Sequence, residues 1–169
     1  MLKIRPCDND EFATILAIVN DAAEAYRGII PADRWHEPYM ESDELRRQIE
    51  EEVVFWGAEC DGALTGVMGL QPVEDVMLIR HAYVRRTAQR SGVGAALLAH
   101  LLESAGERPL LVGTWAAAEW AIAFYRRHGF VAVSEAAIAP LLRRYWSIPA
   151  RQVETSVVLG DANWFTRAG

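Results

Sequence analysis

The sequence predicts an α+β (mixed α/β) domain in which a central, mostly antiparallel twisted sheet of about seven strands carries helices on both faces. Two observations support this fold class. Strand-like and helix-like segments follow one another in the order strand, helix, helix, three strands, helix, strand, helix and two strands. No internal repeat, low-complexity tract or Pro/Gly/Ser-rich linker divides the chain. We therefore expect a single domain over residues 1–169.

A short apolar strand and a helix are expected to open the chain. The strand is predicted at Leu2–Arg5, and the pattern Asp8-x-x-Glu11 is a helix start signal of the capping-box type. Gly28 is expected to end this helix. Its apolar stripe, at helical spacing, consists of Phe12, Ile15, Leu16, Val19, Ala22, Ala23 and Tyr26. Residues 29–40 are interrupted by prolines and rich in aromatic residues, and we predict an ordered loop or lid there.

A second helix and three consecutive strands come next. Ser42 is expected to cap a helix with a strongly charged face, whose apolar positions are Leu45, Ile49 and Val53. The strands are predicted at Val54–Cys60, Ala63–Gln71 and Val76–Val84. The dipeptide Asp61-Gly62 is a hairpin-turn signal, so these strands are expected to form an antiparallel meander.

The second half of the chain is expected to alternate helices and strands. An apolar helix is marked by Leu97, Leu98, Leu101 and Leu102, and a short buried strand by Leu110–Thr114. The next helical stripe, ended by Gly129, consists of Ala117, Trp120, Ala121, Phe124, Tyr125 and His128. Two strands are predicted at Phe130–Ser134 and Val153–Leu159, joined by one short helix within Ile138–Trp146.

Composition excludes several classes of protein. With 51% hydrophobic and 24% charged residues, the chain is built to fold around a core. The formal net charge of −6 makes nucleic acid an unfavourable partner. The two cysteines, Cys7 and Cys60, have no metal-ligand spacing, so we expect no metal and a reducing, cytoplasmic setting. No apolar run reaches the length of a membrane span, and no membrane partner is expected.

The most informative stretch runs from Val84 to Ala95, between a predicted strand and a strongly apolar helix. Glycines at such a turn let the backbone approach a ligand closely, and the first N–H groups of the helix are free to donate. Together with the helix dipole they favour a phosphate. Gly92 and Gly94 alone also fit tight helix packing, and neither a third glycine nor a Gly-Lys-Ser/Thr sequence completes a nucleotide motif.

Two linked motifs make the chain resemble the GNAT superfamily of acetyl-CoA-dependent N-acetyltransferases. The run Gln89-x-x-Gly92-x-Gly94 is similar to the family's Gln/Arg-x-x-Gly-x-Gly/Ala motif. The run Phe124-Tyr125-x-x-x-Gly129-Phe130 is similar to its signature near the C-terminus. The order of predicted elements also matches, so the resemblance covers nearly the whole chain and implies a GNAT-like fold.

The resemblance implies a coenzyme A site and a catalytic acid. Backbone N–H groups would bind the pyrophosphate, from the loop residues Gln89, Arg90, Ser91, Gly92, Val93, Gly94 and Ala95. Backbone groups of Ala82, Tyr83 and Val84 would pair with the pantetheine arm of acetyl-CoA. Tyr125 would protonate the leaving thiolate after direct attack of a primary amine on the thioester. From periodicity alone, Tyr125 also fits a core position.

Two positions depart from the family pattern. Ala118 stands where many members have Asn, a change for which Glu119 could compensate. Leu78 stands where several members have the Glu that helps to deprotonate the amine, so the general base is not identified. The candidates are Glu24, Glu74, Asp75, His81 and Glu119. Strand alternation predicts that His81 faces away from Leu78, Ala82 and Val84, which favours a structural role for it.

The acetyl acceptor is expected to be a small-molecule amine, bound by the aromatic segment between the first two helices. Tyr26 and Trp35 are the predicted acceptor-binding residues, and cation–π attraction would suit a small cationic amine. Trp115, Trp120, Tyr145 and Trp146 fit either the pocket or the core. Two alternatives remain: acetylation of protein lysines or N-termini, and a non-catalytic coenzyme A-binding regulatory module. A homodimer paired through the tail strand, Ser156 to Leu159, is also compatible with the sequence.

Overall fold

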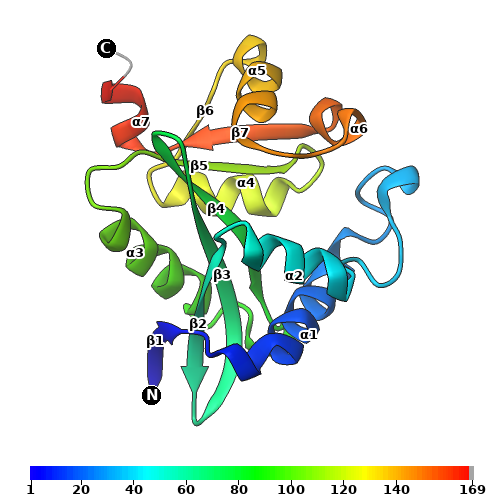
Figure 1. The fold of residues 1–169 in the computed structure, drawn as a ribbon, viewed down its shortest axis with the longest axis vertical. Helices are drawn as coiled ribbons and strands as arrows, with labels where there is room; N and C mark the ends of the chain where they lie inside the picture. The colour runs from blue at the N-terminus through cyan, green and yellow to red at the C-terminus, as the bar shows by residue number, and fades with distance from the viewer. Residues whose placement is uncertain (168–169) are drawn as a thin grey trace.

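The computed structural model describes residues 1–167 and shows a seven-stranded sheet with helices on both faces (Figure 1). The strands are β1 (Leu2–Pro6), β2 (Val54–Cys60), β3 (Ala63–Val73), β4 (Val76–Val84), β5 (Leu110–Trp115), β6 (Val131–Ala132) and β7 (Ser156–Gly160). They lie in the order β1-β2-β3-β4-β5-β7-β6. All neighbours are antiparallel except β4 and β5, which are parallel. The predicted fold class is confirmed.

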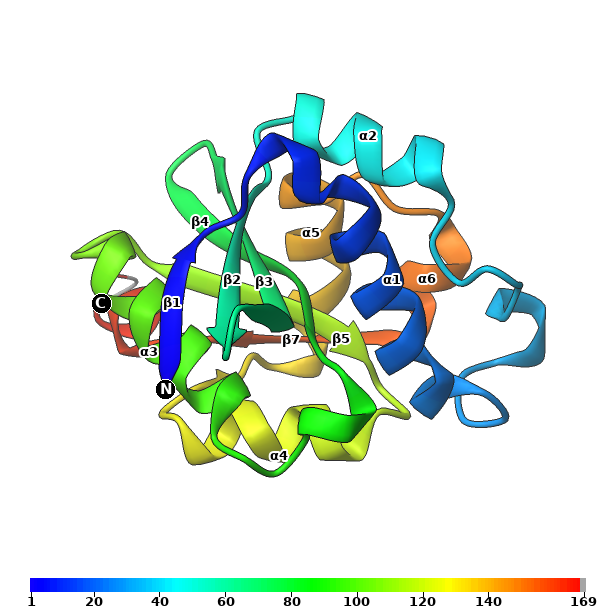
Figure 2. The same ribbon diagram turned by 90° about the horizontal axis from the view of Figure 1, so that it is seen from below.

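Two groups of helices cover opposite faces of the sheet (Figure 2). The helices are α1 (Phe12–Ala22), α2 (Ser42–Glu50), α3 (Val93–Ala105), α4 (Glu119–Arg127), α5 (Glu135–Tyr145), α6 (Ala150–Glu154) and α7 (Ala162–Arg167). Apolar side chains of α3 and α4 share one core with the sheet. On the other face, α1 and α2 cover the first half of the sheet, and α5 and α6 cover the second. No helix among residues 1–167 is long and apolar enough to cross a membrane.

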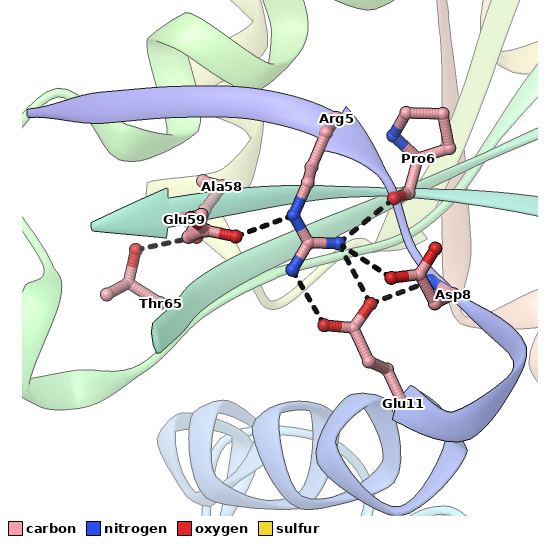
Figure 3. A network of polar contacts seen from close by, with 7 residues as sticks. All are labelled: Arg5, Pro6, Asp8, Glu11, Ala58, Glu59 and Thr65. Atoms are coloured by element: carbon pink, nitrogen blue, oxygen red, sulfur yellow. Dashed lines mark hydrogen bonds and ion pairs between the residues drawn. The ribbon is translucent and has the colours of Figure 1, made fainter. Parts of the chain in front are cut away.

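One arginine ties the first strand to the first helix (Figure 3). The guanidinium of Arg5 donates hydrogen bonds to both carboxylate oxygens of Glu11, at 3.0 and 2.7 Å, and to Glu59 on β2 at 2.6 Å. The carboxylate of Glu11 also accepts the backbone N–H of Asp8, as the capping-box prediction requires. A hydrogen-bonded pair of this kind fixes how α1 leaves the edge of the sheet.

The segment between the first two helices is ordered. The α-helix ends at Ala22 rather than at Gly28, because a 3₁₀ turn, Ala23–Tyr26, takes over the last turn. A further 3₁₀ turn, Ala32–Arg34, lies within the predicted loop. An ion pair between Asp33 and Arg151 of α6, 2.9 Å long, fastens this loop to the C-terminal part of the fold.

The C-terminal elements differ most from expectation. The strand predicted at Phe130–Ser134 is reduced to the two residues of β6, because the next helix, α5, already begins at Glu135. Val153 belongs to α6 instead of a strand, and it is buried against α5 and β7. The helices α6 and α7 were not predicted. Strand β7 lies between β5, which pairs with it from Ser156 to Gly160, and β6, which pairs only with Leu159 and Gly160.

A β-bulge in β4 decides which side chains reach the site. The register between β3 and β4 shifts between Val67 and Gly69, and His81 has a positive φ of 53°. A Cβ atom on Gly69 would lie 2.8 Å from the carbonyl oxygen of Arg80, so the bulge depends on a glycine at that position. The prediction that His81 faces away from Leu78 is therefore wrong, because the bulge interrupts the alternation between them.

The packing of side chains before and after the bulge confirms that the alternation between the two faces of the sheet shifts at the bulge. Leu78 packs with the core under α5, and Tyr83 packs with the core under α1, so both lie on the same face. Ala82 and Val84 pack with the core under α3, on the opposite face. His81 stacks on Phe55 and Tyr83 of the α1 face, so its predicted orientation away from Ala82 and Val84 is confirmed.

Candidate functional site

The two parallel strands at the centre of the sheet separate before they end. Pairing between β4 and β5 covers only Met77 to Ile79 and Leu110 to Val112. Strand β4 continues to Val84 and β5 to Trp115, so the facing edges of both strands have no strand partner beyond this point. Two cavities lie where the strands diverge. The site is built around this opening.

The first cavity has a volume of about 610 Å³ and lies between β4, α3 and α4. Every residue predicted to bind the cofactor lines it except Ser91: Ala82, Tyr83, Val84, Gln89, Arg90, Gly92, Val93, Gly94 and Ala95. Ser91 instead donates its hydroxyl hydrogen to the carbonyl oxygen of Ala88, within the loop. Trp120, Phe124 and Tyr125 of α4 complete the opposite wall. The structure therefore brings the two sequence motifs to one cavity.

The loop before α3 presents hydrogen-bond donors to the first cavity. Gly92 is the N-cap of α3 with a φ of 86°, a conformation that favours glycine. Within residues 1–167, the backbone N–H groups from Arg90 to Ala95 donate no hydrogen bond. Free N–H groups at the N-terminus of a 13-residue helix suit a phosphate. These residues fit the pyrophosphate of a coenzyme A molecule.

Gly94 keeps this cavity open on the side of α4. A Cβ atom at this position would lie 3.5 Å from the ring of Phe124 and 3.8 Å from Val84. A methyl group therefore fits, but a longer side chain would extend into the space between α3 and α4. The position is one at which side-chain size controls access to the loop.

Tyr125 lies in α4 with its ring buried between Phe124 and Phe130. The side chain is 4% exposed, so its ring is part of the hydrophobic core, as the helical spacing allowed. Its hydroxyl donates no hydrogen bond within residues 1–167, and its oxygen is not sealed from solvent. Burial raises the pKa of Tyr125 above its ordinary value, with a smaller contribution from Tyr26. The phenol therefore keeps its proton at neutral pH, as a proton donor must.

The second cavity lies on the other face of the opening and has a volume of about 100 Å³. It is lined by Tyr26, Tyr39, Ile79, Arg80, His81, Tyr83, Gly113, Thr114, Trp115, Leu142, Trp146, Ile148, Gln152 and Ser156. Tyr26 and Tyr83 line both cavities, so the two spaces meet at these rings. Tyr26, which was predicted to bind the acceptor, therefore lies at a cavity.

Trp35, the other predicted acceptor-binding residue, lines neither cavity. Its ring stacks on Tyr39 with the centroids 5.9 Å apart. The guanidinium carbon of Arg27 lies over the Trp35 ring, 4.9 Å from its centroid. Tyr39 in turn accepts a hydrogen bond of 2.9 Å from the indole N–H of Trp115. Trp35 therefore packs against Tyr39, which lines the second cavity.

The remaining aromatic residues divide between the cavities and the core. Trp115 and Trp146 line the second cavity, and Trp120 lines the first. Tyr145 lines neither, because its ring is buried under α5 and its hydroxyl donates to Asp75 at 2.8 Å. Ala118 is fully buried against Ile30 and Trp115.

Of the five candidate bases, only His81 lines a cavity. Glu74 and Asp75 are paired with Arg144 of α5, and Glu24 is paired with Arg27. Glu119 lines neither cavity, although it follows the position where many GNAT members have Asn.

His81 is held as a neutral ring. The N–H of its Nε2 atom donates to the side-chain oxygen of Gln48. Burial, followed by the charge of Arg80, lowers the pKa of His81 to about 3. A neutral imidazole with so low a pKa accepts a hydrogen bond but is a weak base for an ammonium group.

Sequence reasoning missed Arg80 as a cavity residue, and it placed Tyr39 in the aromatic segment that sets acceptor specificity without predicting that it binds the acceptor. Arg80 carries a signal in retrospect, since it is the charged residue within the otherwise apolar first half of β4. Its position could not be derived from alternation, because the bulge places Arg80 and His81 on the wall of the same cavity.

Comparisons with known proteins agree with this geometry. A family model described as an acetyltransferase (GNAT) domain matches residues 18–139. No curated protein matches the chain. A GNAT-family acetyltransferase from Staphylococcus aureus Mu50 superposes with a TM-score of 0.72 at 12% identity, covering 95% of this chain and 98% of that chain.

Two further solved structures are similar over nearly their whole length. The PaiA N-acetyltransferase of Thermoplasma acidophilum, solved in complex with coenzyme A, has a TM-score of 0.70 at 16% identity, with 95% of this chain and 98% of that chain covered. The ribosomal-protein-S18-alanine N-acetyltransferase of Escherichia coli has a TM-score of 0.65 at 17% identity, with coverages of 95% and 93%. At these identities the similarity shows the fold.

Proposed function

Because this chain belongs to the GNAT family of acetyltransferases, we propose that it transfers an acetyl group from acetyl-CoA to the primary amine of a small molecule. The observation that carries this proposal is the meeting of the two cavities at Tyr26 and Tyr83, where β4 and β5 separate. One cavity offers an anion-binding loop and a protonated phenol. The other offers a separate, smaller space for an acceptor.

In this proposal the first cavity binds acetyl-CoA. The N–H groups from Arg90 to Ala95 donate to the pyrophosphate, and the dipole of α3 adds to the attraction. Backbone groups of β4 from Ala82 to Val84 extend the sheet by pairing with the pantetheine arm.

The proposed reaction is a direct transfer in a ternary complex. Acetyl-CoA supplies the thioester, whose C–S bond breaks as the amine nitrogen forms the new C–N bond. A backbone N–H at the separated end of β4 stabilises the negative charge on the carbonyl oxygen. Tyr125 donates its hydroxyl proton to the departing sulfur. The amine must lose a proton before it attacks. Because the low pKa of His81 makes it a weak base, the proton passes to water in this proposal.

A direct test combines acetyl-CoA with a mixed panel of amines and follows the release of the coenzyme A thiol. The products are then identified by their added acetyl mass. Thiol release with an acetylated small molecule supports the proposal. Release only when a protein or peptide is added favours protein acetylation, and binding of acetyl-CoA without release from any acceptor favours a regulatory module.

A further inference from the structure

A single cation stands in the wall of the second cavity. Arg80 lies in β4, opposite Gly69 of β3 in the register of the sheet. Its Nη1 atom donates a hydrogen bond of 2.8 Å to the side-chain oxygen of Gln71. Within residues 1–167 its Nε and Nη2 atoms donate no hydrogen bond, and neither is sealed from solvent. Two donors of a planar guanidinium are therefore available.

The guanidinium is held in place by a buried amide. Gln71 is 8% exposed, and its Nε2 atom donates to the carbonyl oxygen of Glu51 at 2.9 Å. Both ends of this amide are thus engaged, one by the backbone and one by Arg80. A charged group fixed by a buried partner is typical of a built binding site rather than of a mobile surface residue.

The other groups around the cavity leave this charge unneutralised. Within residues 1–167 no carboxylate is among the lining residues, and burial keeps His81 neutral. The acidic groups whose charges act on Arg80, Glu44 and Glu51, lie on and just after α2, and neither forms an ion pair with Arg80 within residues 1–167. Their charges raise the pKa of Arg80 less than burial lowers it.

The charge of the cavity discriminates between acceptors. A second ammonium group in this space would meet the guanidinium of Arg80 and no carboxylate among the residues that line the cavity within 1–167. A carboxylate would accept hydrogen bonds from Nε and Nη2 of the guanidinium. This pairing would offset the unfavourable free energy of burying the charge. The small volume of about 100 Å³ also favours a compact acceptor.

We propose that the acceptor is a small amino acid, whose carboxylate binds Arg80 while its amine points toward the junction at Tyr26 and Tyr83. This inference rests on the proposed function, since it takes the second cavity as the acceptor site. It replaces the small cationic amine expected from the aromatic residues alone. Gln71 acts as a positioning residue that orients Arg80.

The test compares acceptors that differ only in the carboxylate. Thiol release is measured with alanine, serine and glutamate, with the amides of the same amino acids, and with spermidine as a cationic amine. We expect kcat/KM for at least one amino acid to exceed that for its amide by about 30-fold, the size of effect seen for paired charges in a desolvated site.

Variants separate binding of the carboxylate from folding. Arg80→Gln should raise KM for the amino acid by about 30-fold, and it should leave the affinity for acetyl-CoA, which binds in the other cavity, unchanged. Gln71→Glu places a carboxylate beside Arg80 and should abolish the same preference with the arginine still present. Arg144→Gln, which removes an exposed arginine of α5, is the matched control and should change neither value.

The outcomes separate the amino-acid acceptor proposal from the acetyltransferase proposal on which it rests. Equal or faster transfer to amides and spermidine, unchanged in Arg80→Gln, would overturn the amino-acid assignment and leave the acetyltransferase proposal intact. Absence of acetyl-CoA binding, or of thiol release from any acceptor, would overturn the proposed function and this inference with it. Circular dichroism and thermal unfolding of each variant show whether a loss reflects the site or the fold.

Discussion

The rings of Tyr26 and Tyr83 meet edge to face with their centroids 6.2 Å apart, and both residues line both cavities. Tyr26 comes from the turn after α1 and also stacks on Trp120 of α4, at 5.9 Å. Tyr83 comes from the separated end of β4. Elements distant in the sequence thus come together where the proposed donor and acceptor spaces adjoin. A reaction that joins two bound molecules needs such a fixed meeting point.

Replacement of Gly94 by arginine tests the anion-binding loop. The new side chain would extend past Phe124 into the first cavity, where the pyrophosphate is proposed to bind. We expect the variant to fold but to lose the increase in melting temperature that acetyl-CoA gives the wild type. Ser104→Arg, an exposed change near the other end of the same helix, is the control and should keep that increase. Equal stabilisation of both variants by acetyl-CoA would show that the loop has been misinterpreted.

Removal of the Tyr125 hydroxyl tests the proposed acid. Tyr125→Phe keeps the buried ring, so the fold and the affinity for acetyl-CoA should be preserved. Turnover should fall by about 100-fold, the low end of the range for loss of a general acid. Tyr145→Phe removes a phenol outside both cavities and should leave kcat unchanged. A Tyr125→Phe enzyme with wild-type turnover would leave this residue with a packing role only.

The pH dependence follows from two perturbed groups. Tyr125, whose pKa is raised by burial, stays protonated at neutral pH and loses its proton only at high pH. His81, with a pKa of about 3, is already neutral and contributes no change near neutrality. We expect kcat/KM to rise with pH as the acceptor amine loses its proton, with no fall until above about pH 10. A rise centred near about pH 6.5 that disappears in His81→Asn would instead identify His81 as the base.

The ion pairs of Arg5 predict an acid-sensitive contribution to stability. Hydrogen bonds from Arg5 lower the pKa of Glu11 from 4.5 to about 2. A carboxylate with a lowered pKa stabilises the folded state above its unfolded-state pKa and loses that effect as the pH falls through its folded-state value. Glu11→Gln should therefore cost about 1 to 2 kcal/mol of unfolding free energy at neutral pH.

Urea unfolding at several pH values measures this contribution. The difference between wild type and Glu11→Gln should be constant above about pH 5 and shrink as the pH falls toward about 2. Asp43→Asn removes a partner of Arg46 in a fully exposed pair and should leave the unfolding free energy nearly unchanged. A difference for Glu11→Gln that does not vary with pH would contradict the electrostatic explanation.

Much of the fold follows from local patterns in the sequence. The meander of β2, β3 and β4 and the apolar helix α3 were predicted nearly to their ends, because turn signals bound the apolar strand segments and helical spacing marks the helix. The C-terminal part follows tertiary packing instead. Val153 fits a strand by composition, yet it turns into α6 so that its side chain reaches the core beside Leu142 of α5. A local pattern carries no information on that choice.

The site residues also fall into those that local sequence patterns predict and those that depend on tertiary packing. The glycine loop and Tyr125 could be located from spacing and resemblance, since both belong to short continuous motifs. Arg80 could not, because its place depends on the bulge at His81 and on Gln71 of the neighbouring strand. A bulge shifts the alternation by one residue, and single-strand periodicity does not reveal it. Tyr39 reaches the second cavity through a loop whose path is set by contacts with Trp115 and α6.

Calorimetric titration of the wild-type protein with acetyl-CoA tests the central claim most directly. We predict saturable binding of one molecule per chain. Acetyl-pantetheine, which lacks the pyrophosphate together with the adenine nucleotide, should bind much more weakly, since it leaves the N–H groups from Arg90 to Ala95 without an acceptor. Absence of binding, or equal affinity for the two thioesters, would contradict the assignment of the loop before α3 as the cofactor site.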